Sequence, residues 1–190
     1  MRLYTAMDLT AALSQIDQTF AGFVPAIKRI PFLEANHLVL AENVMAAENI
    51  PAFSRSTVDG YAVRAQDTFG ASESIPAFLT LQGKVEMGQT AIPLGKDAAV
   101  YVPTGGMLPQ GADAVVMIEQ TACLDDLVNI YKQVAPGENV IQKGEDVQAG
   151  QPLFAKGRRL KSADIAVLAS LGITEVAVYQ KPRVAVLSTG

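Results

Sequence analysis

Apolar residues near the N-terminus recur at steps of three and four, which is the period of an amphipathic α-helix. Those on the shared face are Leu9, Leu13, Ile16 and Phe20. The pattern predicts a helix over residues 6–19, and Thr5 with Asp8 has capping-box spacing at its start. The elements predicted next are an extended segment over 27–33, a short helix from Glu34 to Glu42 and a strand from Asn43 to Ala47.

From residue 57 to about residue 142 the pattern changes to short apolar runs separated by turn residues. The predicted strands are Gly60–Arg64, Ala77–Met87, Ala98–Pro103, Ala114–Thr121 and Leu127–Val134. Asp125-Asp126 is placed for a tight hairpin between the last two of these strands. Short strands at regular spacing, without a helical pattern, predict a small antiparallel barrel or sandwich.

A helical pattern returns after residue 161, where Ser162 is a suitable N-cap and Gly172 a suitable end. Residues 174–179 then predict a strand. Helix-containing segments therefore flank the β-rich stretch, which indicates one domain inserted into another. The predicted domains are a discontinuous first domain over 1–50 and 147–180 and an inserted β-rich domain over 51–146.

The last stretch, residues 183–190, has a continuous apolar run of Val-Ala-Val-Leu between Arg183 and a final Ser-Thr-Gly. Such a run predicts a strand buried on both faces, of the kind found in parallel sheets. Because a central strand cannot stand alone, we expect residues 181–190 to begin a further α/β domain that is truncated here. The predicted fold class is mixed α+β and mainly β: a discontinuous α/β domain, an inserted β-barrel-like domain and the first strand of that truncated domain.

Composition limits the classes of function. Of the 190 residues, 49% are hydrophobic and 18% are charged, which is typical of a globular protein. The net charge of −4 argues against a nucleic-acid or anionic-membrane partner. One cysteine and one histidine exclude an internal disulfide and multi-histidine metal chemistry within this chain. With no secretory signal or membrane span in the sequence, we expect a cytoplasmic protein.

A polar turn opens the β-rich stretch. Residues 54–57, Ser-Arg-Ser-Thr, lead into Asp59-Gly60, and the apolar run 61–63 follows. Asp and Gly suit a tight turn, because Gly takes positive φ freely and Asp bonds nearby N–H groups. The pattern fits both a polar site at a strand end and an ordinary loop that enters a strand.

Two further clusters are also open to a functional and a structural interpretation. Thr104-Gly105-Gly106 follows a predicted strand, where a hydroxyl and several N–H groups fit an oxyanion or a plain turn. Gly144-Glu145-Asp146 carries paired acids, which fit a hard cation such as Mg²⁺ or a solvated acidic turn.

In combination these clusters carry a resemblance. The matching stretches are Ser56-Thr57-Val58-Asp59-Gly60-Tyr61-Ala62-Val63, Pro103-Thr104-Gly105, Gly111-Ala112-Asp113-Ala114-Val115-Val116, Gly144-Glu145-Asp146 and Ala169-Ser170-Leu171-Gly172. In this order and spacing they closely resemble the molybdopterin molybdenumtransferase family, of the MoeA/gephyrin type, over almost the whole chain. One departure is Asn36-His37-Leu38, which stands where the family often has a Gly-Arg pair.

The resemblance implies an enzyme of molybdenum cofactor biosynthesis. Members insert molybdenum from molybdate into adenylylated molybdopterin, release AMP and require Mg²⁺. They form elongated homodimers whose active cleft lies between the second domain of one subunit and the third domain of the other. The family therefore implies adenylylated molybdopterin and molybdate as substrates, and a truncated chain that is inactive alone.

The family's functional residues carry over onto matching positions of this sequence. The catalytic ones correspond to Asp59, Thr104 and Asp146, and those that shape or bind the substrate to Ser56, Gly60, Gly105 and Glu145. Thr104 with the following glycine amides would donate hydrogen bonds to the oxyanion, with Arg55 or Lys143 as a source of charge. Asp59 and Asp146 would hold the metal or position a water, and the sequence leaves these two roles open.

A second hypothesis belongs to another class. Gephyrin-like relatives also serve as scaffolds, so the same region fits a non-catalytic dimerisation or scaffold module. Binding of molybdate or Mg²⁺ that depends on Asp59 would distinguish the enzyme from the scaffold.

Overall fold

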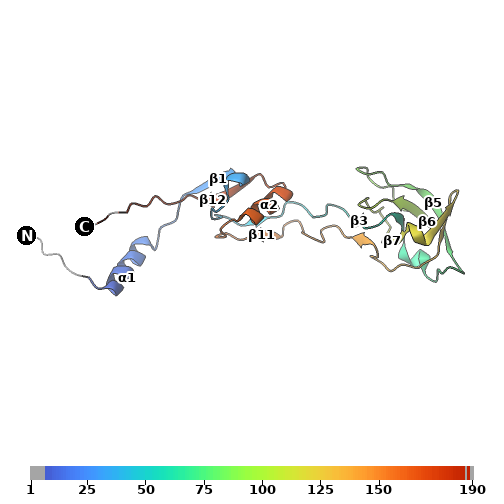
Figure 1. Ribbon diagram of the computed structural model, residues 1–190, viewed down its shortest axis with the longest axis horizontal. Coiled ribbons are helices and arrows are strands. Elements are labelled where there is room, and N and C mark those ends of the chain that lie inside the picture. The colour runs from blue at the N-terminus through green and yellow to red at the C-terminus, as the bar shows by residue number, and fades with distance from the viewer. Residues whose placement is uncertain (1–6, 187, 189–190) are drawn as a thin grey trace, which may run out of the picture. The chain divides into compact units, whose positions relative to one another are not determined.

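The computed structural model describes residues 7–186 and residue 188, and the chain forms two compact units (Figure 1). Unit 1 takes its described residues from Met1–Val44 and Pro152–Gly190, and unit 2 is Met45–Gln151. The domain boundaries expected from the sequence stay a prediction. Within the described residues no helix is both long and apolar enough to cross a bilayer.

Unit 1 is built around a two-stranded antiparallel pairing. Strand β1 (Ile27–Pro31) pairs with β12 (Glu175–Tyr179), from Ile27 opposite Tyr179 to Pro31 opposite Glu175. Helix α2 (Ser162–Ser170) packs Leu168 against Val176 and Val178 of β12. The short strands β2 (Val44–Met45) and β11 (Pro152–Phe154) also pair. Fully buried leucines at 40, 160 and 168 fill this core.

Helix α1 (Leu9–Phe20) confirms the predicted N-terminal helix. Asp8 caps it, because its Oδ1 accepts a hydrogen bond from the N–H of Ala11 at 2.9 Å. Thr5, the other residue of the predicted capping box, lies outside the described residues. No side chain of α1 is buried, so its apolar face is exposed along its length.

The short helix predicted from Glu34 to Glu42 is wrong. Only a 3₁₀ turn, η1 (Phe32–Glu34), forms there. The N–H groups of His37 and Leu40 donate instead to the carbonyls of Leu160 and Arg158, each at 2.9 Å. His37 has φ of +66°, which no α-helix accommodates. Long-range pairing with the second half of unit 1 therefore replaces the local helix.

The start of α2 and the C-terminal stretch differ in detail from expectation. Ser162 is the first residue of the helix, and Lys161, not the predicted Ser162, takes the N-cap position. Residues 181–186 adopt no regular secondary structure. Leu187, Thr189 and Gly190 lie outside the described residues, so the strand predicted for 183–190 stays a prediction.

Unit 2 is dominated by one curled sheet of six strands in the order β7-β4-β6-β5-β9-β8. The strands are β4 (Gly60–Val63), β5 (Ala77–Lys84), β6 (Ala98–Val102), β7 (Ala114–Met117), β8 (Thr121–Leu124) and β9 (Leu127–Ile130). The 3₁₀ turn η2 (Ala65–Thr68) follows β4. A separate short pairing joins β3 (Arg55–Ser56) to β10 (Val140–Ile141). The mainly β, mixed α+β fold class is thus confirmed.

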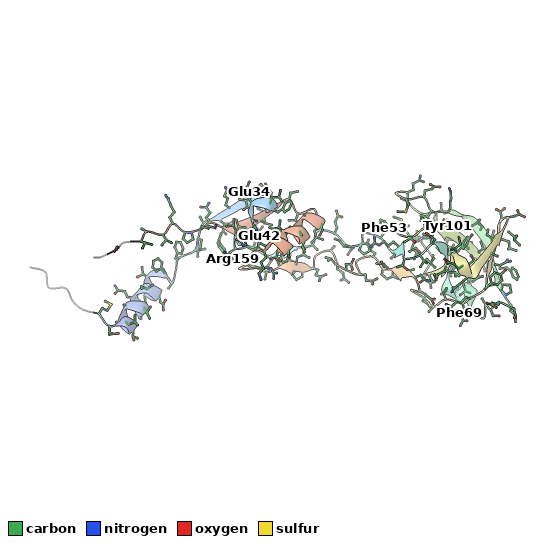
Figure 2. The ribbon with its side chains drawn as sticks, viewed as in Figure 1. Glu34, Glu42, Phe53, Phe69, Tyr101 and Arg159 are labelled. Carbon is green, nitrogen blue, oxygen red and sulfur yellow. The ribbon has the colours of Figure 1, made fainter. Side chains whose placement is uncertain are left out.

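The middle of this sheet is buried on both faces. All four residues of β4 are buried, with Tyr61 and Val63 in one apolar cluster and Ala62 in another. Tyr61 also meets Tyr101 of β6 edge to face, with ring centres 5.8 Å apart (Figure 2 labels Tyr101). Double-sided burial explains why these strands read as continuous apolar runs rather than as alternating ones.

Two features of the sheet differ from the predicted antiparallel set. Strands β5 and β6 are parallel, whereas every other neighbouring pair in the sheet is antiparallel. The strand predicted over 114–121 is divided by a 3₁₀ turn, η3 (Ile118–Gln120). The N–H of Ile118 donates to the carbonyl of Asp59 at 3.0 Å, which draws the chain out of the strand path.

Candidate functional site

Asp59 lies in the connection between β3 and β4, and a buried serine fixes this connection. Ser56 is only 2% exposed. Its hydroxyl donates to the carbonyl of Val58 at 2.6 Å and accepts from the N–H of Val58 at 3.2 Å. The hydroxyl therefore closes the turn locally, as serine side chains do in tight turns. Asp59 follows this closed turn and reaches the surface.

Gly60 begins β4 at a point of close backbone approach. A Cβ at this position would overlap the carbonyl oxygen of Val116 in β7 and lie 2.9 Å from its carbonyl carbon. Only glycine lets β4 pair here with β6 on one side and β7 on the other. Asp59 is thus attached to the start of a central, rigid strand.

Thr104 meets Asp59 because β4 and β6 run antiparallel. Gly60 lies opposite Val102, so the residues that follow β6 return beside those that precede β4. The Oδ1 atom of Asp59 accepts from the N–H of Thr104 at 2.7 Å and from its hydroxyl at 3.2 Å. Both side chains are exposed. The second carboxylate oxygen of Asp59 makes no hydrogen bond with any described residue.

The backbone amides after β6 are engaged within the chain. The N–H of Gly105 donates to the carbonyl of Ser56 at 2.8 Å, and that of Gly106 to the carbonyl of Pro103 at 2.8 Å. Gly105 has φ of +81°, a conformation that favours glycine. With the Thr104 amide bound to Asp59, all three N–H groups have partners. The expectation that the glycine amides offer hydrogen bonds to an oxyanion is therefore wrong.

Asp146 lies on a separate turn. The N–H groups of Gly144 and Asp146 donate to the carbonyls of Pro51 and Ile50, both at 3.0 Å. The carboxylate of Glu145 accepts from the N–H of Gln142 at 2.8 Å, so Glu145 closes its own turn. The Asp146 side chain is exposed and has no hydrogen bond to Asp59 or Thr104 among the described contacts. The structure thus pairs Asp59 with Thr104 and leaves Asp146 apart from that pair.

The exposed carboxylates of this region fit only one kind of metal site. Nowhere in the described residues do three or more His, Cys, Asp or Glu side chains gather into a metal cluster. The chain therefore offers no cage built from protein ligands alone. Mg²⁺ is usually held by one or two carboxylates, with waters and substrate phosphates as its other ligands. The exposed carboxylates of Asp59 and Asp146 fit that second arrangement.

Tyr61 follows Gly60 but takes no part in the polar site. Burial raises the pKa of the Tyr61 hydroxyl, and the neighbouring Cys123 thiol raises it further. A buried tyrosine with a raised pKa stays protonated at neutral pH and serves as core.

Residues that the sequence analysis did not single out line a cavity of about 740 Å³ in unit 2. Its walls include Phe53, Pro93, Met107 and Gln110, next to the predicted charge source Lys143. Arg55, the other predicted charge source, lies half-buried on β3 and does not line this cavity. Turn residues such as Pro93, Pro109 and Gly111 mark these walls in the sequence, and turn residues alone do not reveal a cavity.

Comparison with known proteins places these features in a family. Residues 7–172 match the model of the MoeA N-terminal region (domain I and II). A protein from Staphylococcus aureus named molybdopterin molybdenumtransferase is 39% identical over 168 residues. That alignment covers 88% of this chain and 40% of the relative, so the chain spans well under half of the relative's length.

Solved structures agree with the sequence match. A crystal structure of a molybdopterin biosynthesis MoeA protein from Pyrococcus horikoshii superposes with a TM-score of 0.80 at 39% identity. It covers 90% of this chain and 44% of that protein. A second structure of a MoeA protein from Pyrococcus horikoshii gives a TM-score of 0.74 at 40% identity, over 84% of this chain and 42% of that one. The chain therefore belongs to the family of MoeA N-terminal regions.

Proposed function

We propose that the chain acts in molybdenum cofactor biosynthesis, as the N-terminal portion of an enzyme that inserts molybdenum into adenylylated molybdopterin. The substrates are molybdate and adenylylated molybdopterin, and AMP is released. Membership of the MoeA N-terminal family supports the pathway, since relatives carry the name molybdopterin molybdenumtransferase. The chain covers only 40% of such a relative, so activity requires the remainder of the enzyme.

The pairing of Asp59 with Thr104 is the observation that carries this proposal. Thr104 binds one carboxylate oxygen and leaves the other directed to solvent beside a rigid strand end. A carboxylate held in this way is suited to bind a metal or to orient a water for attack on a phosphoanhydride. Its exposure gives a substrate access from solvent.

Mg²⁺ is part of the proposal. When bound, the ion would neutralise the phosphate oxygens of adenylylated molybdopterin. Asp59 supplies an open carboxylate oxygen, and Asp146 an exposed carboxylate without a partner among the described contacts. Ser56, Gly60 and Gly105 hold Asp59 and Thr104 in place, while Glu145 holds the turn that carries Asp146.

The test is a chimera in which residues 7–172 of this chain replace the matching region of the Staphylococcus aureus molybdopterin molybdenumtransferase. We expect it to restore molybdoenzyme activity to cells that lack that enzyme, and Asp59→Ala to abolish the rescue. Asp97→Ala is the matched control, because Asp97 is an exposed aspartate of the same unit whose one ion pair within the described residues is with Lys96. Rescue by the Asp59→Ala chimera at the unmodified level would contradict the proposal.

We also propose that the chain works in the cytoplasm as a homodimer. The exposed apolar stripe of α1 supports self-association, since Leu9, Leu13, Ile16 and Phe20 are all more than half exposed. Burial of such a stripe against a second copy removes apolar area from water. Sedimentation of the chain should give a dimer, and Leu13→Asp with Ile16→Asp a monomer. A monomeric unmodified chain would contradict self-association through α1.

A further inference from the structure

One cavity of unit 2 has walls from four segments that are far apart in the sequence. They are residues 52–54, 90–91 with 93, 107–113 and 142–143, and the cavity, which is open to solvent, has a volume of about 740 Å³. This volume falls in the range of small-molecule sites, which is roughly 300–1,000 Å³. None of the residues assigned above to the reaction, Asp59, Thr104 and Asp146, lines it.

Backbone hydrogen bonds hold these walls together before any ligand binds. The N–H of Leu108 donates to the carbonyl of Ser54 at 2.8 Å, and that of Leu94 to the carbonyl of Gln110 at 2.9 Å. The N–H of Lys143 donates to the hydroxyl of Ser54 at 3.0 Å. Ser54 therefore ties two walls to the segment that carries Phe53. A pre-formed site avoids the entropy of ordering loops during binding.

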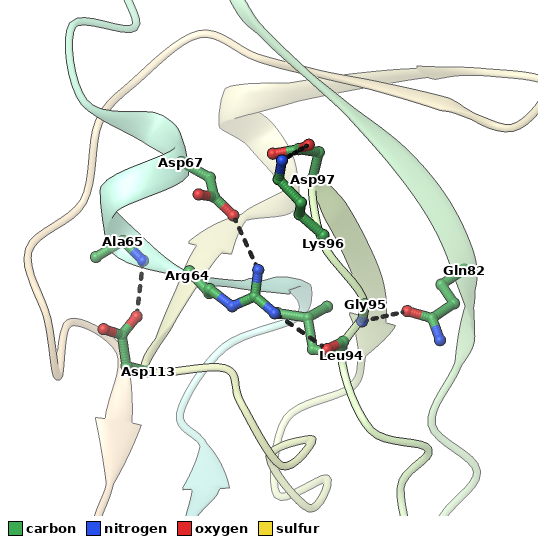
Figure 3. Close-up of polar contacts among 9 residues, drawn as sticks. All are labelled: Arg64, Ala65, Asp67, Gln82, Leu94, Gly95, Lys96, Asp97 and Asp113. Carbon is green, nitrogen blue, oxygen red and sulfur yellow. Dashed lines mark hydrogen bonds and ion pairs between the residues drawn. The ribbon is translucent and has the colours of Figure 1, made fainter.

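Side chains reinforce the same region (Figure 3). Arg64 donates to the carbonyl of Leu94 at 3.3 Å, and the N–H of Gly95 donates to Gln82 at 2.7 Å. One carboxylate oxygen of Asp113 accepts from the N–H of Ala65 at 2.7 Å, which fixes the direction of this side chain. The other oxygen of Asp113 makes no hydrogen bond with any described residue, and Asp113 is one of the residues that line the cavity.

The chemistry of the walls indicates the class of ligand. Phe53 is 38% exposed and, with Pro93 and Met107, offers an apolar surface for a flat ring. Gln110 and Asp113 supply the acceptors and donors that match ring amide and amino groups. Lys143 is exposed and pairs with no carboxylate in the described part of the chain, so its ammonium suits an acidic substituent.

A smaller cavity adjoins this site and is lined in part by the loop that follows Thr104. It has a volume of about 160 Å³ and shares Phe53, Thr90 and Met107 with the larger one. Its other walls include Gly105 and Gly106, which directly follow Thr104. Phe53 therefore borders both cavities, and the smaller one is lined by the two glycines that follow Thr104.

We propose that the 740 Å³ cavity binds a planar nitrogen heterocycle that carries an acidic group, with Phe53 against the ring and Lys143 at the acid. This inference rests on the proposed function, because adenylylated molybdopterin contains such a ring at each end, a pterin and an adenine. Gln110 and Asp113 select the ring edge, and Lys143 favours the anionic form of the ligand over a neutral analogue.

The test uses two probes, 6-carboxypterin and AMP, titrated into the full chain. The chain has no tryptophan, so pterin fluorescence is read without protein emission at the same wavelengths, and AMP is followed by calorimetry. We expect saturable binding of at least one probe. Binding of 6-carboxypterin would show that the cavity takes the pterin end of the substrate, and binding of AMP that it takes the adenine end. Phe53→Ala should weaken it roughly tenfold, as expected from loss of ring stacking. Phe53→Leu, which keeps the apolar volume, should weaken it as well.

Matched controls separate the site from general effects. Phe69→Ala removes an exposed phenylalanine elsewhere in unit 2, and Lys132→Met an exposed lysine outside this cavity (Figure 2 labels Phe53 and Phe69). Neither control should change the affinity for the probe that binds. Lys143→Met should lower that affinity and make it depend less on salt concentration, because the ammonium no longer pairs with the acidic group of the probe. Absence of binding by both probes, or unchanged affinity in both Phe53 variants, would overturn the proposal. Rescue by the chimera is a separate readout, so failure of the cavity and failure of the proposed function are distinguishable.

Discussion

The carboxylate of Asp59 accepts two hydrogen bonds from one residue, Thr104, through its backbone N–H at 2.7 Å and its hydroxyl at 3.2 Å. The two residues are 45 positions apart and meet because β4 and β6 are antiparallel neighbours. This pairing makes the end of β6 and the start of β4 one rigid unit. It also determines which carboxylate oxygen of Asp59 remains available for chemistry.

The first prediction separates the charge of Asp59 from its structural role. Asn at position 59 keeps an oxygen acceptor for the Thr104 N–H but loses the negative charge. We expect Asp59→Asn to change the free energy of unfolding by less than about 1 kcal/mol, since the site is exposed. In the chimera, molybdenum insertion should fall about a hundredfold or more, because a neutral amide holds a cation more weakly than a carboxylate and does not act as a base. Denaturation and insertion assays measure the two effects.

A structural role alone gives a different pattern. Thr104→Val removes the hydroxyl but keeps the N–H bond to Asp59, and Thr104→Ser keeps both. If Asp59 acts only by holding the loop, Asp59→Asn should retain insertion activity. In that case Thr104→Val should lower activity through the lost hydroxyl, and Thr104→Ser should match the unmodified chimera. Retained activity in Asp59→Asn would remove the carboxylate charge from the mechanism.

The second prediction concerns Gly60. A Cβ there overlaps the Val116 carbonyl, and the backbone of β4 cannot move away cheaply because β4 is paired with β6 on one side and β7 on the other. Gly60→Ala should destabilise unit 2 by about 3 kcal/mol or more, as severe overpacking does. Amide hydrogen exchange in β4 and β7 would measure the loss. Gly22→Ala is the control, because a Cβ at Gly22 meets nothing within 4 Å. Equal exchange in the two variants would contradict the close approach.

The positions of single elements followed from local patterns, whereas their partners did not. The step of three and four from Leu9 to Phe20 predicted α1, and apolar runs predicted the strands of unit 2. The helix expected from Glu34 to Glu42 failed because His37 and Leu40 donate their N–H groups to residues more than 100 positions away. Local propensity carries no information about such partners.

The candidate site shows the same limit. Asp59 and Thr104 were each recognised within short polar motifs, yet only strand pairing reveals that one binds the other. The sequence suggested that the N–H groups of Gly105 and Gly106 are free to bind a ligand. In the structure they donate to the carbonyls of Ser56 and Pro103. The cavity beside Phe53 is lined by four segments that are distant in the sequence, so no local motif predicts it.

The third prediction concerns Thr68, a polar residue with no exposed surface. Its hydroxyl donates to the carbonyl of Ala65 at 2.7 Å and accepts from the N–H of Val134 at 3.1 Å. Thr68→Val keeps the shape and leaves both partners unsatisfied, so unit 2 should lose about 1–3 kcal/mol. Thr68→Ser keeps the hydroxyl and should lose less. Chemical denaturation checks the difference, and a loss in Thr68→Val no larger than that in Thr68→Ser would show that the two hydrogen bonds of the hydroxyl contribute no net stability.

The last prediction is a pH dependence of unit 1. Hydrogen bonds from Arg158 at 2.8 and 3.2 Å, with one from the Lys161 N–H, hold the pKa of the Asp164 carboxyl below its usual range. The unfolded chain therefore binds this proton more readily, so the stabilisation is complete above about pH 5 and is lost as the pH falls below about 4. Asp164→Asn should lower stability by about 2 kcal/mol at pH 7, and the gap should shrink toward pH 3. Urea denaturation across this range measures the gap, and a gap that stays constant to pH 3 would show that the charge of Asp164 contributes nothing.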